Sequence, residues 1–67
     1  MEDLYKLKAL LPHWLEHNEE HAQGYSDWAD KLHSLGQDEL SEIMNQISEE
    51  TRKTSALFQK AIDLLER

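Results

Sequence analysis

The sequence contains no cysteine, only two glycines and one proline, and no long hydrophobic run within its 67 residues. The lack of cysteine excludes disulfides and thiolate metal sites. A chain this short buries too small a fraction of its surface to be comfortably stable alone. The other usual sources of stability are a metal ion or oligomerisation. Residues 1–67 are therefore expected to form a single domain that needs a metal, a partner or both.

Basic residues are scarce as well. Seven lysines and arginines stand against fourteen aspartates and glutamates, which gives a formal charge of −7. A phosphate-binding surface needs clustered cations, and the cluster here is limited to Arg52 and Lys53. Nucleic acid and anionic membrane surfaces are therefore not expected partners. No apolar run approaches the ~20 residues that span a bilayer, and the first residues lack the features of a signal peptide. The sequence predicts a soluble, cytoplasmic protein.

What the sequence does contain is a helix-forming composition with a regular apolar pattern. Two runs of residues are separated by Gly36. Within each run the residues follow one another at alternating three- and four-residue steps, which is the heptad pattern of a coiled-coil-like seam. The first run is Leu4, Leu7, Leu11, Trp14, Asn18, His21, Tyr25, Trp28, Leu32 and Leu35. The second run is Leu40, Met44, Ile47, Thr51, Thr54, Phe58, Ala61 and Leu65.

The short connection between the runs predicts an all-α, antiparallel helical hairpin. Gly36 suits a left-handed helix C-cap, and Asp38 suits the N-cap of the second helix. Pro12 removes one helical hydrogen bond inside the first run. Because the seam continues in phase across Pro12, a kinked or gently broken helix is favoured. The alternative is a separate short helix over about residues 2–10 that folds back to give three helices.

A wide apolar face indicates packing against more than one helix. Six further apolar residues flank the seam: Leu10, Leu15, Ile43, Leu57, Ile62 and Leu64. A stripe of this width is broader than a strict two-stranded seam needs. The simplest product is a homodimer that forms a four-helix bundle.

The middle of the predicted core is polar. Folding the hairpin about Gly36 places His21 opposite Thr54 and gathers one layer of side chains: Asn18, His21, Tyr25, Thr51 and Thr54. A buried polar group without a partner costs about 1–3 kcal/mol. These residues are therefore expected to form a network or to bind something. Gly24 in the same region suggests either a close backbone approach or room for a ligand.

Three histidines at four-residue spacing form the candidate metal site. His17 and His21 lie one helical turn apart, so both can reach a single ion. His13 lies about 12 Å from His21 along a straight helix and must pair with His17, serve a second site or join another chain. Glu50 is a candidate ligand from the second helix or from a partner. Imidazole with carboxylate suits Zn, Ni, Co or non-haem iron, so the predicted ligand set is His17, His21, His13 and Glu50.

Other interpretations of the same residues stay open. His21 is equally well explained as a core imidazole bonded to Tyr25 or a threonine, and His13 and His17 as surface partners of Glu16 and Glu20. A pH-sensitive interface is a third interpretation. No cysteine nucleophile or glycine-rich phosphate loop is present, so an enzyme is not expected.

Two functions are therefore predicted from the residues. The first is a small helical oligomer that binds a transition metal (Zn, Ni or Co) through histidines and acts in metal handling or sensing. The alternative is a non-metal protein–protein interaction module whose buried polar layer sets the oligomeric state.

Residues 11–29, LPHWLEHNEEHAQGYSDWA, carry a resemblance to a known group of proteins. The stretch resembles small uncharacterised prokaryotic helical domains with an L-P-H-W-x-x-H-N-x-x-H-A signature, followed by an aromatic residue and a tryptophan. The positions that match are Pro12, His13, Trp14, His17, Asn18, His21 and Trp28. The resemblance implies a histidine-based metal or ligand site.

Overall fold

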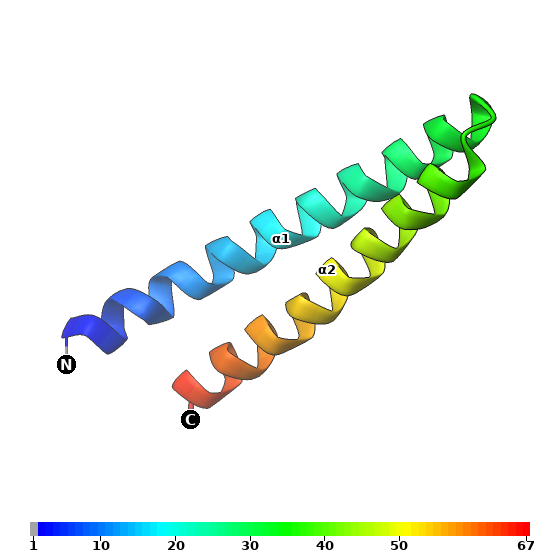
Figure 1. The fold of residues 1–67 in the computed structure, drawn as a ribbon. Coiled ribbons are helices and arrows are strands. Elements are labelled where there is room, and N and C mark those ends of the chain that lie inside the picture. The colour runs from blue at the N-terminus through cyan, green and yellow to red at the C-terminus, as the bar shows by residue number, and fades with distance from the viewer. Residues whose placement is uncertain (1) are drawn as a thin grey trace.

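The chain folds into two long antiparallel helices joined by a short turn, in a computed structural model that describes residues 2–67. Helix α1 spans Glu2–Ser34 and helix α2 spans Asp38–Leu65 (Figure 1). The molecule measures 53 × 14 × 12 Å. The prediction of an all-α antiparallel hairpin is confirmed. Neither helix in residues 2–67 is long and apolar enough to cross a membrane.

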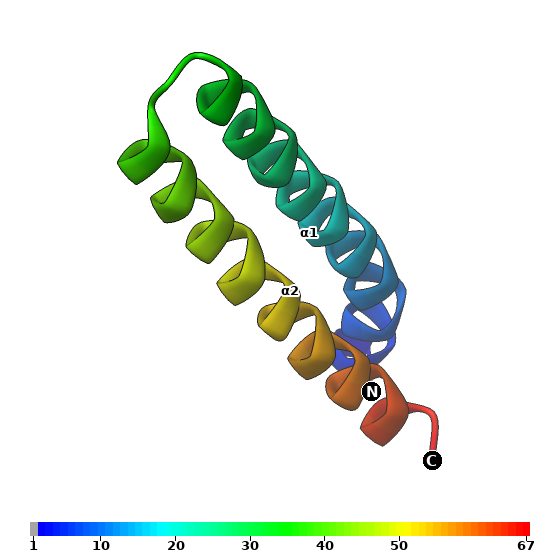
Figure 2. The ribbon, with the colours of Figure 1, turned by 90° about the vertical axis from the view of Figure 1, so that its right-hand side faces the viewer.

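Helix α1 continues through Pro12 without interruption. The first turns of α1, in blue, lean away from the line of the rest of the helix (Figure 2). This is the expected consequence of a proline that removes one hydrogen bond and crowds the preceding turn. The favoured interpretation of one bent helix therefore holds, and the three-helix alternative is wrong.

The turn between the helices ends α1 with a left-handed glycine. Gly36 has φ 78°, as a C-cap requires. The backbone N–H of Gly36 donates to the His33 carbonyl at 3.0 Å, and that of Gln37 donates to the Leu32 carbonyl at 2.9 Å. These two bonds form a Schellman motif and confirm the predicted role of Gly36.

The predicted N-cap of the second helix is wrong by one residue. Gln37 is the N-cap of α2, without a side-chain capping bond, and Asp38 is the first helical residue. The Asp38 carboxylate lies 3.0 Å from Nδ1 of His33 across the turn. The negative charge of Asp38 in the first turn of α2 still interacts favourably with the helix dipole.

Small residues form the seam between the two helices. Ala22 and Ala29 of α1 are fully buried. Ser41, Ser48 and Ser55 of α2 are buried to 6% exposure or less, and Ser48 and Ser41 lie against the two alanines. The Oγ of Ser41 donates to the Ala29 carbonyl at 2.7 Å, and the Oγ of Ser48 donates to the Ala22 carbonyl at 2.8 Å. Such bonds require a close approach of the two backbones, at the lower end of the ~8–10 Å range for packed helices. Leu11 and Ile62 close the seam near the open end of the hairpin.

This seam corrects the predicted one. Trp14, Trp28, Leu40 and Ile47, all placed in the predicted seam, are exposed. Trp28, Leu40 and Ile47 each come directly before a buried small residue, so each points about 100° away from the partner helix. Large side chains cannot occupy the seam positions at which a serine hydroxyl reaches the opposite backbone.

The predicted level of pairing is corrected too. The bond from Ser48 places residue 22 of α1 opposite residue 48 of α2. His21 therefore lies level with about residue 49, not with Thr54, a shift of about five residues along α2. The compact turn and the close small-residue contact fix this register.

Candidate functional site

The hairpin has two different faces, and the position of each residue relative to the seam determines its face. In an antiparallel helix pair, residues directly before seam positions on either helix fall on one side, and residues directly after them fall on the other. The residues before the seam positions are His21, Trp28, Leu40, Ile47, Thr54 and Ala61. The residues after them are Gln23, Asp30, Glu42, Glu49, Ala56 and Asp63. One side is mainly apolar and the other is mainly charged.

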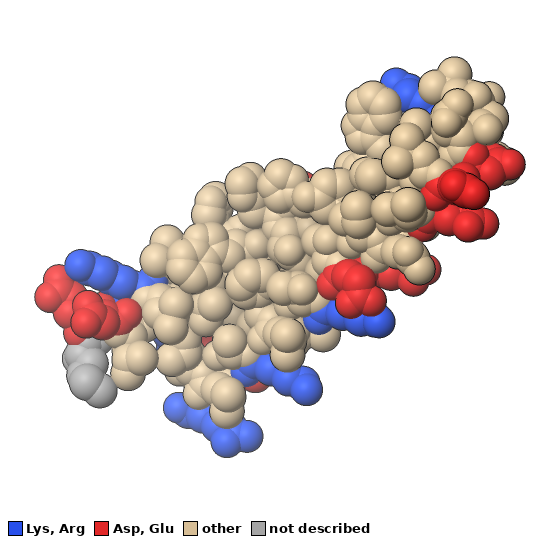
Figure 3. All heavy atoms as spheres, in the orientation of Figure 1, with Lys and Arg blue, Asp and Glu red and all other residues tan. Residues whose placement is uncertain are grey.

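We define the apolar face as the large exposed hydrophobic side chains on the first of these sides. They are Leu4, Leu10, Trp14 and Trp28 of α1, Leu35 in the turn, and Leu40, Ile43, Ile47, Leu57 and Leu64 of α2. Trp28 is 54% exposed and Leu57 is 63% exposed. In Figure 3, uncharged side chains run along the length of the visible face, and charged ones lie at its margins. Monomeric proteins rarely expose a contiguous apolar surface of this extent.

The opposite side, the polar face, is held by charged contacts between the helices. The Arg52 guanidinium lies 3.6 Å from a carboxylate oxygen of Glu19 and donates to Oε1 of Gln23 at 3.3 Å. Gln23 in turn donates to the carboxylate of Asp27 at 2.9 Å. These side chains are exposed, so the charged groups of the polar face interact with water and with one another.

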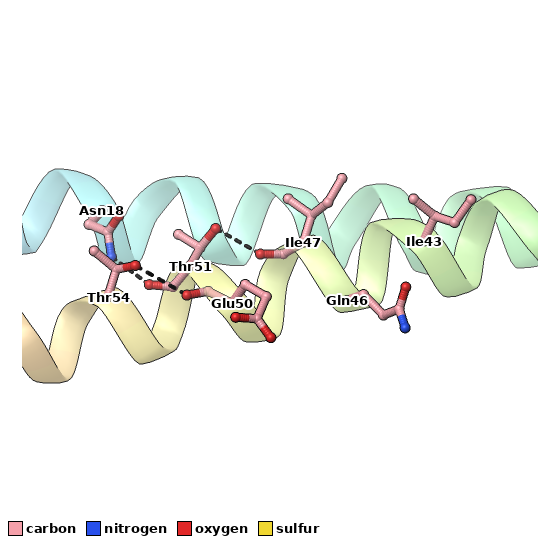
Figure 4. A pocket seen from close by; sticks show the side chains of 7 residues that line it. All are labelled: Asn18, Ile43, Gln46, Ile47, Glu50, Thr51 and Thr54. Carbon is pink, nitrogen blue, oxygen red and sulfur yellow. Dashed lines mark hydrogen bonds between the residues drawn. The ribbon is translucent and has the colours of Figure 1, made fainter.

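A shallow groove of about 370 Å³ lies at the centre of the apolar face. It is lined by Asn18 of α1 and by Ile43, Gln46, Ile47, Glu50, Thr51 and Thr54 of α2 (Figure 4). Asn18 joins the two helices beside it, because its Nδ2 donates to the Thr51 carbonyl at 2.7 Å and to the Ser55 hydroxyl at 2.9 Å. The groove therefore combines an apolar wall with a fixed polar group.

The structure brings together part of the predicted polar layer. Asn18, Thr51 and Tyr25 are half-buried, and Asn18 contacts the backbone of Thr51. His21 and Thr54 are exposed, which corrects their placement in the core. Both lie directly before seam residues and so face outward. The Thr54 hydroxyl donates to the Glu50 carbonyl of its own helix at 3.2 Å.

The three histidines and Tyr25 form a row of neighbouring rings along α1, in which the His17 and His21 rings are tilted and the other two pairs are stacked. The ring centroids are 5.9 Å apart for His13 and His17, 4.9 Å for His17 and His21, and 6.2 Å for His21 and Tyr25. All three histidines are exposed. His21 lies on the apolar face between the two tryptophans, and His17 follows it one turn away at the outer edge. The closest pair is therefore the one with the predicted His-x3-His geometry.

The rest of the predicted ligand set does not join this pair within the chain. A carboxylate oxygen of Glu50 accepts a hydrogen bond from Nζ of Lys53 at 3.1 Å. His13 stacks on His17 but lies two turns from His21. Within residues 2–67, no three histidine, aspartate or glutamate side chains are grouped so that they could hold a metal ion. Of the predicted ligands, the chain therefore brings His17 and His21 closest together, without a third ligand beside them.

The seam residues are the feature that sequence reasoning missed. Ser41, Ser48 and Ser55 repeat at seven-residue intervals, as do Ala22 and Ala29. That repeat was a usable signal, because small residues at one heptad position allow helices to approach closely. Gly24 was linked to a close backbone approach or to room for a ligand; outside its own stretch of helix, no atom of the hairpin lies within 4 Å of the position its Cβ would take, so no close approach of α2 explains it.

Comparisons with known proteins give a family but no activity. No solved structure matches the chain significantly. An uncharacterized protein of Archaeoglobus fulgidus is 32% identical over 60 residues, which cover 90% of this chain and 95% of the relative. A family model described as "Domain of unknown function (DUF8180)" matches residues 7–65, which include the histidine-rich segment. The chain therefore belongs to this family of domains of unknown function, in agreement with the resemblance to a small uncharacterised prokaryotic group.

Proposed function

We propose that this protein is a self-associating interaction module in which a second copy covers the apolar face and completes a four-helix bundle. The observation that supports this most strongly is the position of the large hydrophobic side chains. Of these, Trp28, Leu57 and Leu64 are more than half exposed, whereas the seam inside the hairpin consists mainly of alanine and serine. In the proposed bundle, each hairpin thus supplies half of the hydrophobic core through its apolar face.

The exposed area of the chain is consistent with a missing partner. The chain exposes 5315 Å². A compact monomer of 7.9 kDa is expected to expose about 4,400 Å², so the excess is about 900 Å². Two such chains packed into one compact particle would together bury about 3,300 Å². This value lies within the range of about 2,000–5,000 Å² seen for obligate homodimers.

A second copy fits the chemistry of this face. Charged side chains are concentrated on the polar face, where Arg52 already contacts Glu19. Two apolar faces can therefore meet while most of the negative charge of both chains stays in water. A self-complementary surface is what a symmetric dimer interface requires.

The test uses two neighbouring residues that lie on opposite faces. Leu57→Glu places a charge on the apolar face, and Ala56→Glu places the same charge on the polar face. We expect the natural chain and Ala56→Glu to sediment as dimers at micromolar concentration and Leu57→Glu to sediment as a monomer. A natural chain that sediments as a monomer, or a Leu57→Glu variant that remains a dimer, would contradict the proposal.

A second candidate function is transition-metal binding through His17 and His21. It is supported by their 4.9 Å ring separation and their shared exposure on one edge of α1. A ligand that binds only the folded state raises its unfolding temperature. The test is thermal unfolding of metal-stripped protein with Zn²⁺, Ni²⁺ or Co²⁺. We expect a metal-specific rise that disappears in the double variant His17→Ala/His21→Ala, and no rise with any metal would reject this function.

A further inference from the structure

We infer that α1 pairs antiparallel with α1 of a second copy about residue 19, and that this pairing gathers four imidazoles into one tetrahedral site for a divalent transition metal. The inference rests on the proposed self-association and specifies its geometry. The ligands are His17 and His21 of each chain. The site is incomplete in one hairpin and complete in the dimer.

The outer stripe of α1, defined as residues 10, 14, 17, 21, 24 and 28, can pack against the same stripe of an antiparallel second copy. If residue 19 lies at the twofold axis, each residue faces the residue that is equally far on the other side of residue 19. Large side chains then lie opposite small or apolar ones. The pairs are Leu10 with Trp28, Trp14 with Gly24, and His17 with His21. Gly24 has open space around the position of its Cβ, which provides room for the indole of the second copy. The unexplained glycine of α1 thus acquires a packing role.

The outer stripe of α2, defined as residues 40, 47, 50, 54, 57 and 64, can pack against itself in the same way if residue 52 lies at the twofold axis. Here the pairs are Leu40 with Leu64, Ile47 with Leu57, and Glu50 with Thr54. Residues 19 and 52 lie at one level of the hairpin, because the Arg52 guanidinium contacts the Glu19 carboxylate at 3.6 Å. A single twofold axis therefore satisfies both helices at once, with apolar layers toward both ends and polar side chains in the middle.

The charge distribution favours the antiparallel dimer, in which the two turns lie at opposite ends, over a dimer in which both turns lie at the same end. Residues 20–51, the half that contains the turn, carry eight acidic residues and one basic residue. Residues 1–19 and 52–67 together carry six of each. The whole net charge of −7 therefore lies in the turn half. In Figure 3, most of the basic side chains lie in the open half, where acidic side chains accompany them, and acidic side chains predominate toward the turn. An antiparallel dimer places each acidic half against a neutral one and avoids direct repulsion between the two acidic halves.

The geometry around the axis suits a tetrahedral ion. His17 and His21 are separated by about 6 Å along the helix, so each lies about 3 Å from the level of the axis. Their rings already lie side by side, with centroids 4.9 Å apart. Four imidazole nitrogens about 2.0–2.1 Å from the ion match the coordination of Zn²⁺. A divalent cation also offsets part of the negative charge of the dimer.

The first test is a titration of metal-free protein with Co²⁺, whose visible absorption is intense in tetrahedral sites and weak in octahedral ones. We expect one Co²⁺ ion per two chains and a tetrahedral spectrum. His17→Ala and His21→Ala should each abolish that spectrum, whereas His13→Ala and His33→Ala should leave it unchanged. Two ions per dimer, an octahedral spectrum or dependence on Glu50 would overturn the four-imidazole site.

The second test measures the orientation of the two chains. Because the chain lacks cysteine, Gln37→Cys places a single spin label at the exposed turn. In the inferred dimer the two labels lie at opposite ends, at a distance close to the 53 Å length of the molecule. If both turns were at the same end, the labels would lie about 10–20 Å apart, and the inference would be overturned.

The outcomes distinguish this inference from the proposed function on which it rests. A dimer with distant labels and one cobalt ion supports both. A dimer that binds no cobalt, or that has close labels, overturns the inferred site and leaves self-association standing. A protein that stays monomeric at all concentrations and with added Co²⁺ overturns both.

Discussion

The seam inside the hairpin and the apolar face on its outside differ in the size of their side chains. Inside, Ala22 and Ala29 meet serines whose hydroxyls bond to the opposite backbone. Outside, Trp28 and Leu57 remain more than half exposed. The chain thus places its smallest residues where its own helices touch and its largest where they do not. The internal contact therefore favours close approach of the backbones over burial of large hydrophobic side chains.

This difference has an energetic consequence. Each serine bond in the seam contributes about 0.5–1.5 kcal/mol, and alanine and serine side chains bury little apolar area. Burying a large apolar side chain contributes about 1.5–3 kcal/mol. Covering one large side chain of the apolar face should therefore contribute more free energy to association than one serine bond of the seam contributes to folding.

A large side chain introduced into the seam should cause the greatest loss of folding stability. We expect Ser48→Leu to cost about 2–4 kcal/mol, because leucine forces the backbones apart and removes the bond to the Ala22 carbonyl. For a domain of this size the unfolding temperature should fall by at least about 10 °C. Thermal unfolding followed by circular dichroism at fixed protein concentration measures this change.

The neighbouring residue supplies the control for bulk in the seam. Glu49→Leu adds the same side chain on the exposed polar face, so we expect a change within about 0.5 kcal/mol. An equal loss of stability in the two variants would show that leucine itself, and not its place in the seam, is responsible.

The apolar face should respond in association more than in folding. Trp28→Ala removes an aromatic side chain of the kind that dominates interfaces, and we expect the dimer dissociation constant to rise about 30-fold, or by about 2 kcal/mol. Tyr5→Ala is the matched control, since Tyr5 is 79% exposed and lies two heptads before Glu19 on the polar side. Sedimentation over a dilution series measures both constants. A Tyr5 variant that dissociates as readily as the Trp28 variant would remove the distinction between the faces.

The fold could be predicted because it depends on strong local signals. Gly36 ends one periodic run, Asp38 begins the next, and the short turn requires antiparallel helices. The bend at Pro12 followed from the chemistry of proline. The rotation of the helices about their axes could not be predicted from hydrophobic periodicity alone, because periodicity identifies the most apolar stripe. It does not say whether that stripe meets the other helix or another molecule.

The candidate site was predictable to the same extent. The spacing of His17 and His21 determines their proximity, so this close pair of rings follows directly from the helix. The burial of His21 depended on the rotation that the pattern leaves undetermined, and His21 is exposed. Asn18 was correctly placed at a helix contact because it lies at the edge between the seam and the apolar face.

Asn18 allows a finer comparison at that edge. We expect Asn18→Ala to cost about 1–2 kcal/mol, because it removes two bonds that cross between the helices, to the Thr51 carbonyl and to the Ser55 hydroxyl. Thr54→Ala removes a bond within one helix at an exposed position, so its effect should stay within about 0.5 kcal/mol. Urea unfolding of both variants gives the difference. Equal effects would mean that the cross-helix bonds add nothing beyond local helix stability.

The smallest effect is expected on the polar face. Arg52→Ala removes a solvated ion pair with Glu19 and a bond to Gln23, and exposed pairs of this kind contribute about 0.2–1 kcal/mol. The loss should shrink in 1 M salt, where the screening length falls to about 3 Å. Lys53→Ala is the control, because Lys53 contacts Glu50 within its own helix. A loss for Arg52→Ala that is several times larger and independent of salt would show that the polar face is part of a buried contact.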